Sequence, residues 1–208
     1  MHGSITVHMR HDYEKIMIHE LLLKRYSTRR FAARKVEDEK IERLFEAARW
    51  APSSMNEQPW RFLIGERGDE NFDKIIKVLN EKNRVWASNA PLLILTMTRL
   101  YSSRNNKLNK HSYYDLGGAA AHLTFQATAM GLYVRQMGGF DPDKARYVFE
   151  IPDVYSPVSV LAVGYKSDEP VELLKRERKE LSEIVFTDKF GVPYNFAAVT
   201  PAEYKERE

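Results

Sequence analysis

The apolar run PLLILTM, from Pro91 to Met97, constrains the fold most. A strand with one solvated face alternates apolar and polar residues, whereas this run is nearly continuous and is typical of a strand covered on both faces. It is far too short to cross a bilayer, which takes about 20 apolar residues. Helical and strand patterns alternate along the rest of the chain, which indicates a mixed α/β protein.

Composition excludes several classes of protein. The 208 residues suffice for one large domain or two small ones, and 43% hydrophobic with 29% charged residues is ordinary for a globular protein. The net charge of +3 is too balanced to indicate nucleic acid or an anionic membrane. The chain has no cysteine, which excludes disulfides, thiolate metal sites and a cysteine nucleophile. Without an apolar signal core near the start, we expect a cytoplasmic protein. Three histidines, at 2, 8 and 11, could form a metal site, but a disordered or expression-derived start explains them better, so no metal site is expected.

Periodicity and capping residues predict the order of elements. The segment 99–112 is polar and is expected to be mobile, and the helix 113–130 is small or apolar nearly all round, so His122 in it is expected to be a core residue. The predicted domain spans 13–186, between a disordered or expression-derived start at 1–12 and a tail at 187–208 that packs on a partner. Helices are predicted over 13–24, 38–50, 69–79 and 113–130 and from Asp141, and strands over 60–65, 91–98, 133–136 and 157–165.

Four segments have side chains suited to binding chemistry, whereas the common nucleotide, zinc-protease and serine-hydrolase motifs are absent. In 24–30, KRYSTRR, arginine forks and a serine hydroxyl suit phosphate oxygens, although a cationic helix end explains them equally well. In 51–60, APSSMNEQPW, stiffening prolines and amides suit a flat heterocycle, and a polar connector is the alternative. In 135–141, RQMGGFD, glycines admit a ligand to the backbone, or simply form a turn. The cluster 175–179 is the fourth, with a solvated charged face as its alternative.

Taken together and in this order, these segments resemble the FMN-dependent nitroreductase family over residues 13–186. The segment 25–29 is similar to the family's RxSxR/K opening, and 51–60 is similar to its APSSxNxQPW loop. YDLG at 114–117 heads a helix of the family's central type. The resemblance implies an α+β fold of three layers, α-β-α, with a central, mostly antiparallel sheet. It also implies an intertwined homodimer with one FMN at each half of the interface.

The resemblance further assigns residues to the cofactor. Arg25 and Ser27 would hold the phosphate with Arg178 and Arg176, and Arg29 would lie near the pyrimidine edge, where its charge supports the reduced ring. Some members have Glu where this chain has Gly138, which leaves the choice between NADH and NADPH open. The full set of expected FMN contacts is Arg25, Tyr26, Ser27, Arg29, Pro52, Ser53, Ser54, Asn56, Asn80, Asn83, Gln136, Met137, Gly138, Gly139, Arg176 and Arg178, of which 52–56 would come from the other subunit.

The implied activity is hydride transfer from NAD(P)H through FMN to a flat acceptor, a nitroaromatic, quinone or flavin, by a ping-pong mechanism. The flavin carries the chemistry, so no catalytic side chain is expected beyond the electrostatic support of Arg29. Tyr101, Tyr113 and Phe140 are candidates for aromatic walls, and 99–112 for a lid. A flavin-fragmenting or reductive-dehalogenase relative, a non-catalytic FMN-binding protein and a structural protein that has lost its cofactor are the alternatives. No nucleic-acid or membrane partner is expected.

Overall fold

The computed structural model describes residues 18–168 and 176–196. Residues 18–169 form one compact unit, and the second unit comprises the two ends of the chain, so each is described by itself. The predicted domain boundaries stay predictions. The histidines near the start, at 2, 8 and 11, lie outside the described residues.

A four-stranded antiparallel sheet forms the middle layer of the larger unit, in the order β1-β2-β4-β3. Its strands are β1 (Trp60–Glu66), β2 (Leu92–Arg99), β3 (Tyr133–Met137) and β4 (Tyr155–Gly164). The second strand pairs on both sides and is buried at all but its last residue, which confirms the prediction from the apolar run. Its register with β4 shifts between Thr96 and Met97, opposite Pro157, where a residue without an N–H cannot continue the ladder.

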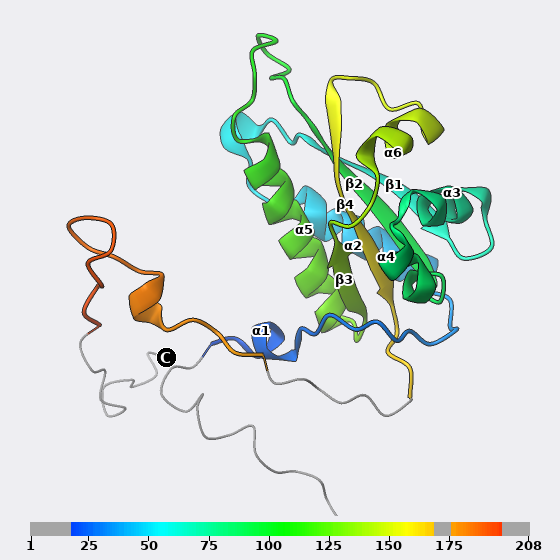
Figure 1. Cartoon of the computed structure of the whole chain (residues 1–208), viewed down its shortest axis with the longest axis horizontal. Helices are drawn as coiled ribbons and strands as arrows, with labels where there is room; N and C mark the ends of the chain where they lie inside the picture. The colour runs from blue at the N-terminus through cyan, green and yellow to red at the C-terminus, as the bar shows by residue number, and fades with distance from the viewer. Residues whose placement is uncertain (1–17, 169–175, 197–208) are drawn as a thin grey trace, which may run out of the picture. The chain divides into compact units, whose positions relative to one another are not determined.

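Helices cover both faces of this sheet, which gives the three layers expected of the fold (Figure 1). Within β2, Leu93 and Leu95 face one hydrophobic cluster while Leu92 and Ile94 face the other, because successive side chains of a strand point to opposite faces. One cluster packs under α3 (Glu70–Val78), α4 (Glu81–Ala87) and α6 (Pro142–Val148), and the other under α2 (Asp38–Arg49) and α5 (Ser112–Ala129).

Local capping decides where several helices begin. Asp69 accepts a hydrogen bond from the Phe72 amide at 2.6 Å, and Asp141 accepts one from the Lys144 amide at 2.9 Å, so both predicted N-caps are confirmed. The helix α4 was not predicted. The local signal for its start is Asn80, whose side chain is the N-cap of α4. Another helix, α1 (Glu20–Lys24), covers only the end of the predicted 13–24, and residues 13–17 lie outside the described part.

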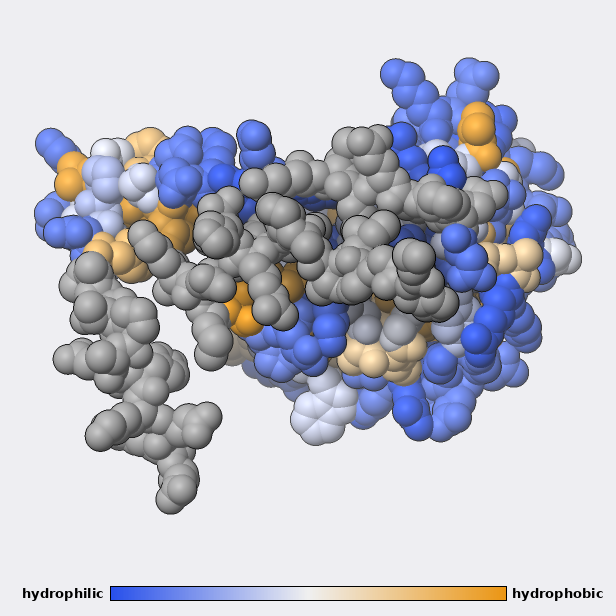
Figure 2. Space-filling view, turned by 90° about the horizontal axis from the view of Figure 1, so that it is seen from below, coloured by the Kyte–Doolittle hydropathy of each residue, from blue (hydrophilic) through white to orange (hydrophobic). Residues whose placement is uncertain are grey.

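The longest helix, α5, begins and ends within one residue of its prediction but is not enclosed on all sides. It buries the face that bears Leu116 and Leu123 against the sheet, but Tyr114, Gly117 and His122 on other faces are exposed. The prediction that His122 is a core residue is therefore wrong for the single chain, because α5 lies in an outer layer instead of at the centre. On the face that Figure 2 shows, apolar residues lie in small patches among hydrophilic ones.

Two further segments have local contacts of their own. Residues 101–108 form a closed turn in which Tyr101 bridges Leu108, so this part of the predicted loop has its own hydrogen bonds. Residues 176–196, in the second unit, contain a short 3-10 turn, η2 (Leu181–Glu183), and a pair of rings, Phe186 and Phe190, with centroids 4.9 Å apart. Among the described helices, none combines the length and apolar character needed to cross a membrane.

Candidate functional site

The segment 25–31 follows the edge of the sheet where β4 ends. Phe31 bridges Lys166, and the Arg135 guanidinium on β3 donates to the Ser27 carbonyl at 2.7 Å. The Arg25 guanidinium donates to the Ser27 hydroxyl at 3.1 Å. Two guanidinium groups and a hydroxyl therefore meet at one half-buried place, and this donor set suits phosphate oxygens. We call Arg25, Ser27 and Arg135 the cation cluster.

A buried threonine shapes this segment. The Thr28 hydroxyl accepts from the Arg30 amide at 2.9 Å and donates to the Arg30 carbonyl at 3.0 Å, which closes a tight turn. The turn leaves Arg29 exposed and Tyr26 half-buried. Neither Thr28 nor Arg135 was among the predicted site residues. Thr28 has a local signal, because a threonine can bind the amide two residues after it. Arg135 has none, because its contact with Ser27 spans 108 residues.

The two glycines after β3 meet the start of α4. The Asn80 amide and the Asn83 side-chain amide both donate to the Gly139 carbonyl, each at 3.1 Å. We call this contact of the pair Gly138 and Gly139 with Asn80 and Asn83 the glycine crossing. The resemblance assigned all four residues to the ring. Gly138 is exposed, and a Cβ built on it would meet no atom within 4 Å, so its backbone is open to a ligand.

Two other predicted contacts flank the crossing and differ in exposure. Gln136 is exposed, and its side chain donates to the Thr124 hydroxyl on α5 at 3.3 Å. The Met137 side chain is buried in the core, only 3% exposed. Met137 is therefore placed to offer its backbone, and not its side chain, because its side chain packs in the hydrophobic cluster on one face of the sheet.

The loop 52–58 has an unusual backbone. Met55, Asn56 and Gln58 have φ of 54°, 57° and 48°, in the left-handed region that favours glycine. The buried Asp115 carboxylate, on the first turn of α5, accepts from the Ser54 amide at 3.2 Å, and the Ser53 hydroxyl accepts from the Gln58 amide at 3.0 Å. Residues in such conformations persist where their surroundings hold them, and they concentrate at ligand sites.

Glu57 joins this loop to the turn 101–108. Its carboxylate accepts from the Ser102 hydroxyl at 2.6 Å and from the amide and hydroxyl of Ser103, both at 2.9 Å. The Ser102 hydrogen bond above all, followed by the Ser103 amide, lowers the pKa of Glu57 to about 2. The Arg104 guanidinium donates to the Met55 carbonyl at 3.0 Å. Sequence reasoning did not single out Glu57, because its partners lie some 45 residues away.

Within one chain, the loop 52–58 and the cation cluster lie apart. The loop leads into Trp60 on β1, which is level with Thr98 on β2 and with Ser156 on β4, whereas Arg135 on β3 is level with Ala162 on β4. Six residues of strand span about 20 Å, and β1 and β3 are opposite edges, about 14 Å apart. The candidate aromatic walls divide in the same way. Tyr101 and Tyr113 lie on the elements that hold the loop, and Phe140 lies at the glycine crossing.

The remaining predicted contacts lie elsewhere. Pro52 and Asn56 are exposed on the loop. Arg176 and Arg178 belong to the second unit, where the Arg178 guanidinium donates to the Glu177 carbonyl at 3.2 Å. Their part in the site stays a prediction.

Comparison with known proteins decides the family. Residues 22–165, more than two thirds of the chain, match the model of the Nitroreductase family. This chain belongs to the nitroreductase family. The match covers the cation cluster, the loop 52–58 and the glycine crossing.

Relatives of this chain support the fold and the type of protein. A solved structure described as an oxidoreductase containing FMN is 27% identical, with a TM-score of 0.78, and the alignment covers 92% of this chain and 100% of that one. A nitroreductase family protein from Clostridium difficile 630 is 32% identical, with a TM-score of 0.69, over 82% of this chain and 97% of its own. A protein of Methanothermobacter thermautotrophicus named "Putative NADH dehydrogenase/NAD(P)H nitroreductase" is 27% identical over 81% of this chain and 87% of its own.

The residues of this chain fit the FMN of the first relative. A phosphorylated flat ring needs cationic and hydroxyl donors at one end and open backbone beside the ring. The cation cluster supplies the first, and exposed Gly138 supplies the second.

Proposed function

We propose that this chain is an FMN-dependent oxidoreductase that uses NAD(P)H to reduce a flat aromatic acceptor by a ping-pong mechanism. When bound, FMN supplies the hydride chemistry, so the protein contributes binding, orientation and electrostatics. The observation that carries the proposal is that both groups are attached to one stretch of chain: Arg135 of the cation cluster lies on β3, and the glycine crossing follows directly after β3. The FMN-containing relative and the nitroreductase names of others support it.

In this proposal, each group of residues has a distinct task. The guanidinium of Arg25 and the hydroxyl of Ser27 bind the phosphate, and Arg135 fixes the Ser27 backbone that presents them. The open backbone at Gly138 lets the ring approach, while Asn83 holds Gly139 in place. Arg29, which is exposed in the single chain, places a positive charge near the pyrimidine edge and favours the reduced state.

A second copy of the chain completes the site. The loop 52–58 has the polar groups expected to contact the flavin, yet in one chain it lies about 20 Å along the strands from the cation cluster. A groove of about 600 Å³ between α1, α2 and α5 includes Leu21, Phe125 and Trp50, and Trp50 is 73% exposed. An apolar groove with an exposed tryptophan supports a homodimer formed over these helices.

A complementation experiment tests the shared site. Arg25→Ala removes the phosphate ligand and Asn56→Ala removes a loop ligand, so each variant alone is expected to lose FMN. In a mixed dimer, one site has both defects and the other has neither. Random remixing of the two variants therefore restores FMN binding to about one quarter of all sites, since half of the dimers are mixed. No recovery, with both variants dimeric and folded, would show that loop and cluster serve the same subunit's site.

The activity itself is tested by spectroscopy. The purified protein is expected to be yellow, to bleach when NADH or NADPH is added without oxygen, and to recover its colour with menadione. A protein that binds FMN but is not bleached would be the non-catalytic binder. Steady-state plots are expected to be parallel, because reductant and acceptor use one slot in turn, and intersecting plots would contradict a ping-pong cycle.

A further inference from the structure

A pocket of about 320 Å³ adjoins the glycine crossing. It forms where the chain after β3 crosses the connection between α3 and α4: Leu79 bridges Phe140, and the Asp141 amide donates to the Val78 carbonyl at 2.8 Å. Asn80 belongs both to this pocket and to the crossing. The pocket is therefore built by the same contacts that position the backbone proposed to face the flavin.

Three cations line this pocket: Lys77 from α3, Arg84 from α4 and Lys144 from α6. Among the described residues that line the pocket, the one carboxylate is Asp141, which accepts from the Lys144 amide as the N-cap of α6. Within residues 18–168, none of the three cations has an ion-pair partner within 4.0 Å. The lining residues that the structure describes thus have a net charge of +2, from three cations and one carboxylate, and this charge favours an anionic ligand.

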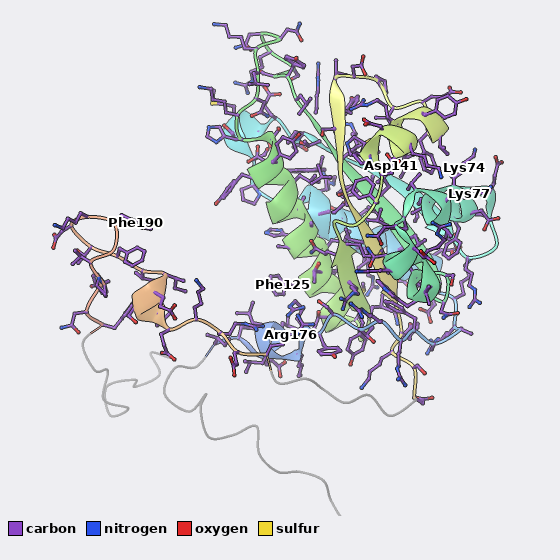
Figure 3. The ribbon with its side chains drawn as sticks, in the orientation of Figure 1. Lys74, Lys77, Phe125, Asp141, Arg176 and Phe190 are labelled. Atoms are coloured by element: carbon purple, nitrogen blue, oxygen red, sulfur yellow. The ribbon has the colours of Figure 1, made fainter. Side chains whose placement is uncertain are left out.

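A neighbouring lysine shows that the arrangement is local. Lys74 lies on the same helix, one turn before Lys77, and is paired with Glu70 at 2.8 Å. It does not line the pocket. Figure 3 shows both lysines on α3 and Asp141 at the start of α6. One lysine of this helix is therefore neutralised, while the other contributes its charge to the pocket.

We propose that this pocket binds the 2′-phosphate of NADPH, so that the enzyme prefers NADPH to NADH. The inference rests on the proposed function, because a reductant must lay its nicotinamide over the flavin beside Gly138 and Gly139. Its remaining part then extends from the crossing, and the pocket adjoins that crossing through Asn80. At about 320 Å³ the pocket is at the small end for ligand sites, which suits one phosphorylated end of a dinucleotide instead of the whole molecule.

Reductant kinetics test the preference. The wild type is expected to have a kcat/KM at least about tenfold higher with NADPH than with NADH, as one charge-assisted contact would give. Lys77→Ala and Lys144→Ala are expected to lower kcat/KM about three- to tenfold with NADPH and to leave it unchanged with NADH. Lys74→Ala, the matched control, changes neither. Equal use of the two reductants would overturn the proposal. An equal loss for both reductants in the pocket variants would also overturn it, because the pocket would then bind the pyrophosphate that both share.

Direct binding separates this inference from the proposed function. In calorimetric titrations of the purified protein, 2′,5′-ADP is expected to bind more tightly than 5′-AMP, which lacks the 2′-phosphate. Lys77→Ala removes the difference and Lys74→Ala keeps it. Inorganic phosphate that competes as well as 2′,5′-ADP at equal concentration would show a general anion site and overturn the assignment to NADPH. If neither reductant bleaches the flavin, the proposed function fails, while the titration still decides whether the pocket recognises a 2′-phosphate.

Discussion

The glycine crossing can be broken by a single methyl group. In Gly139→Ala, the new Cβ would lie 2.7 Å from the Asn83 side-chain nitrogen and closer still to that of Asn80, whereas ordinary contacts begin near 3.4 Å. Neither side chain is free to move away. Asn80 accepts from the Asn83 amide at 3.0 Å as the N-cap of α4, and Asn83 donates to the Gly139 carbonyl at 3.1 Å.

The expected cost follows from these two contacts. Losing an N-cap costs about 1 kcal/mol, and losing one hydrogen bond costs about 1 kcal/mol. The neighbouring Gly138→Ala is the control for stability, because its Cβ would meet nothing within 4 Å. Both changes reduce the freedom of the unfolded chain to a similar extent, so this effect cancels in the comparison. Gly139→Ala should therefore be about 2 kcal/mol less stable than Gly138→Ala, or melt roughly 4–8 °C lower.

Urea unfolding of the two variants without added FMN measures the difference, since a bound ligand would stabilise both. A double-mutant cycle with Asn80→Ala identifies the cause. On that background the clash with Asn80 and the cap are already gone, so Gly139→Ala should cost markedly less than in the wild type. Equal unfolding midpoints for Gly139→Ala and Gly138→Ala would refute the reasoning, because they would show that the asparagines move aside without loss.

Three further outcomes are expected. Ile94→Ala removes a fully buried side chain of β2 and should lower the free energy of unfolding by about 2–5 kcal/mol in urea titrations, and a loss below 1 kcal/mol would contradict the packing described. Folding lowers the pKa of Glu57 from 4.5 to about 2. The ionised carboxylate therefore stabilises the fold fully at a pH above 4.5, and this stabilisation is lost as the pH falls from about 5 to 2. Glu57→Gln should therefore flatten the decrease in urea midpoint between pH 5 and 3, and an unchanged slope would count against this carboxylate. Arg29→Ala should make bound FMN harder to reduce, as measured against a reference dye, and an unchanged potential with FMN still bound would argue against its proposed place.

Local sequence determined most of the layers. The unbroken apolar run specified a strand covered on both faces, and Asp69 and Asp141 specified two helix starts, because caps and periodicity act over a few residues. The segments 25–29 and 51–60 also showed their chemistry directly, since arginines beside a serine and amides between prolines need no distant partner to be noticed. These patterns were sufficient for the family and for the class of fold.

Tertiary structure decided how those segments are joined. The Arg135 contact with Ser27, the Asn83 contact with Gly139 and the Glu57 contact with Ser102 link residues 108, 56 and 45 positions apart, and no local pattern encodes such pairs. Only the strand register shows that the loop 52–58 and the cation cluster lie at different places on the sheet. The physical reason is that side-chain type determines what a residue can bind, whereas packing of the whole chain determines which residues meet.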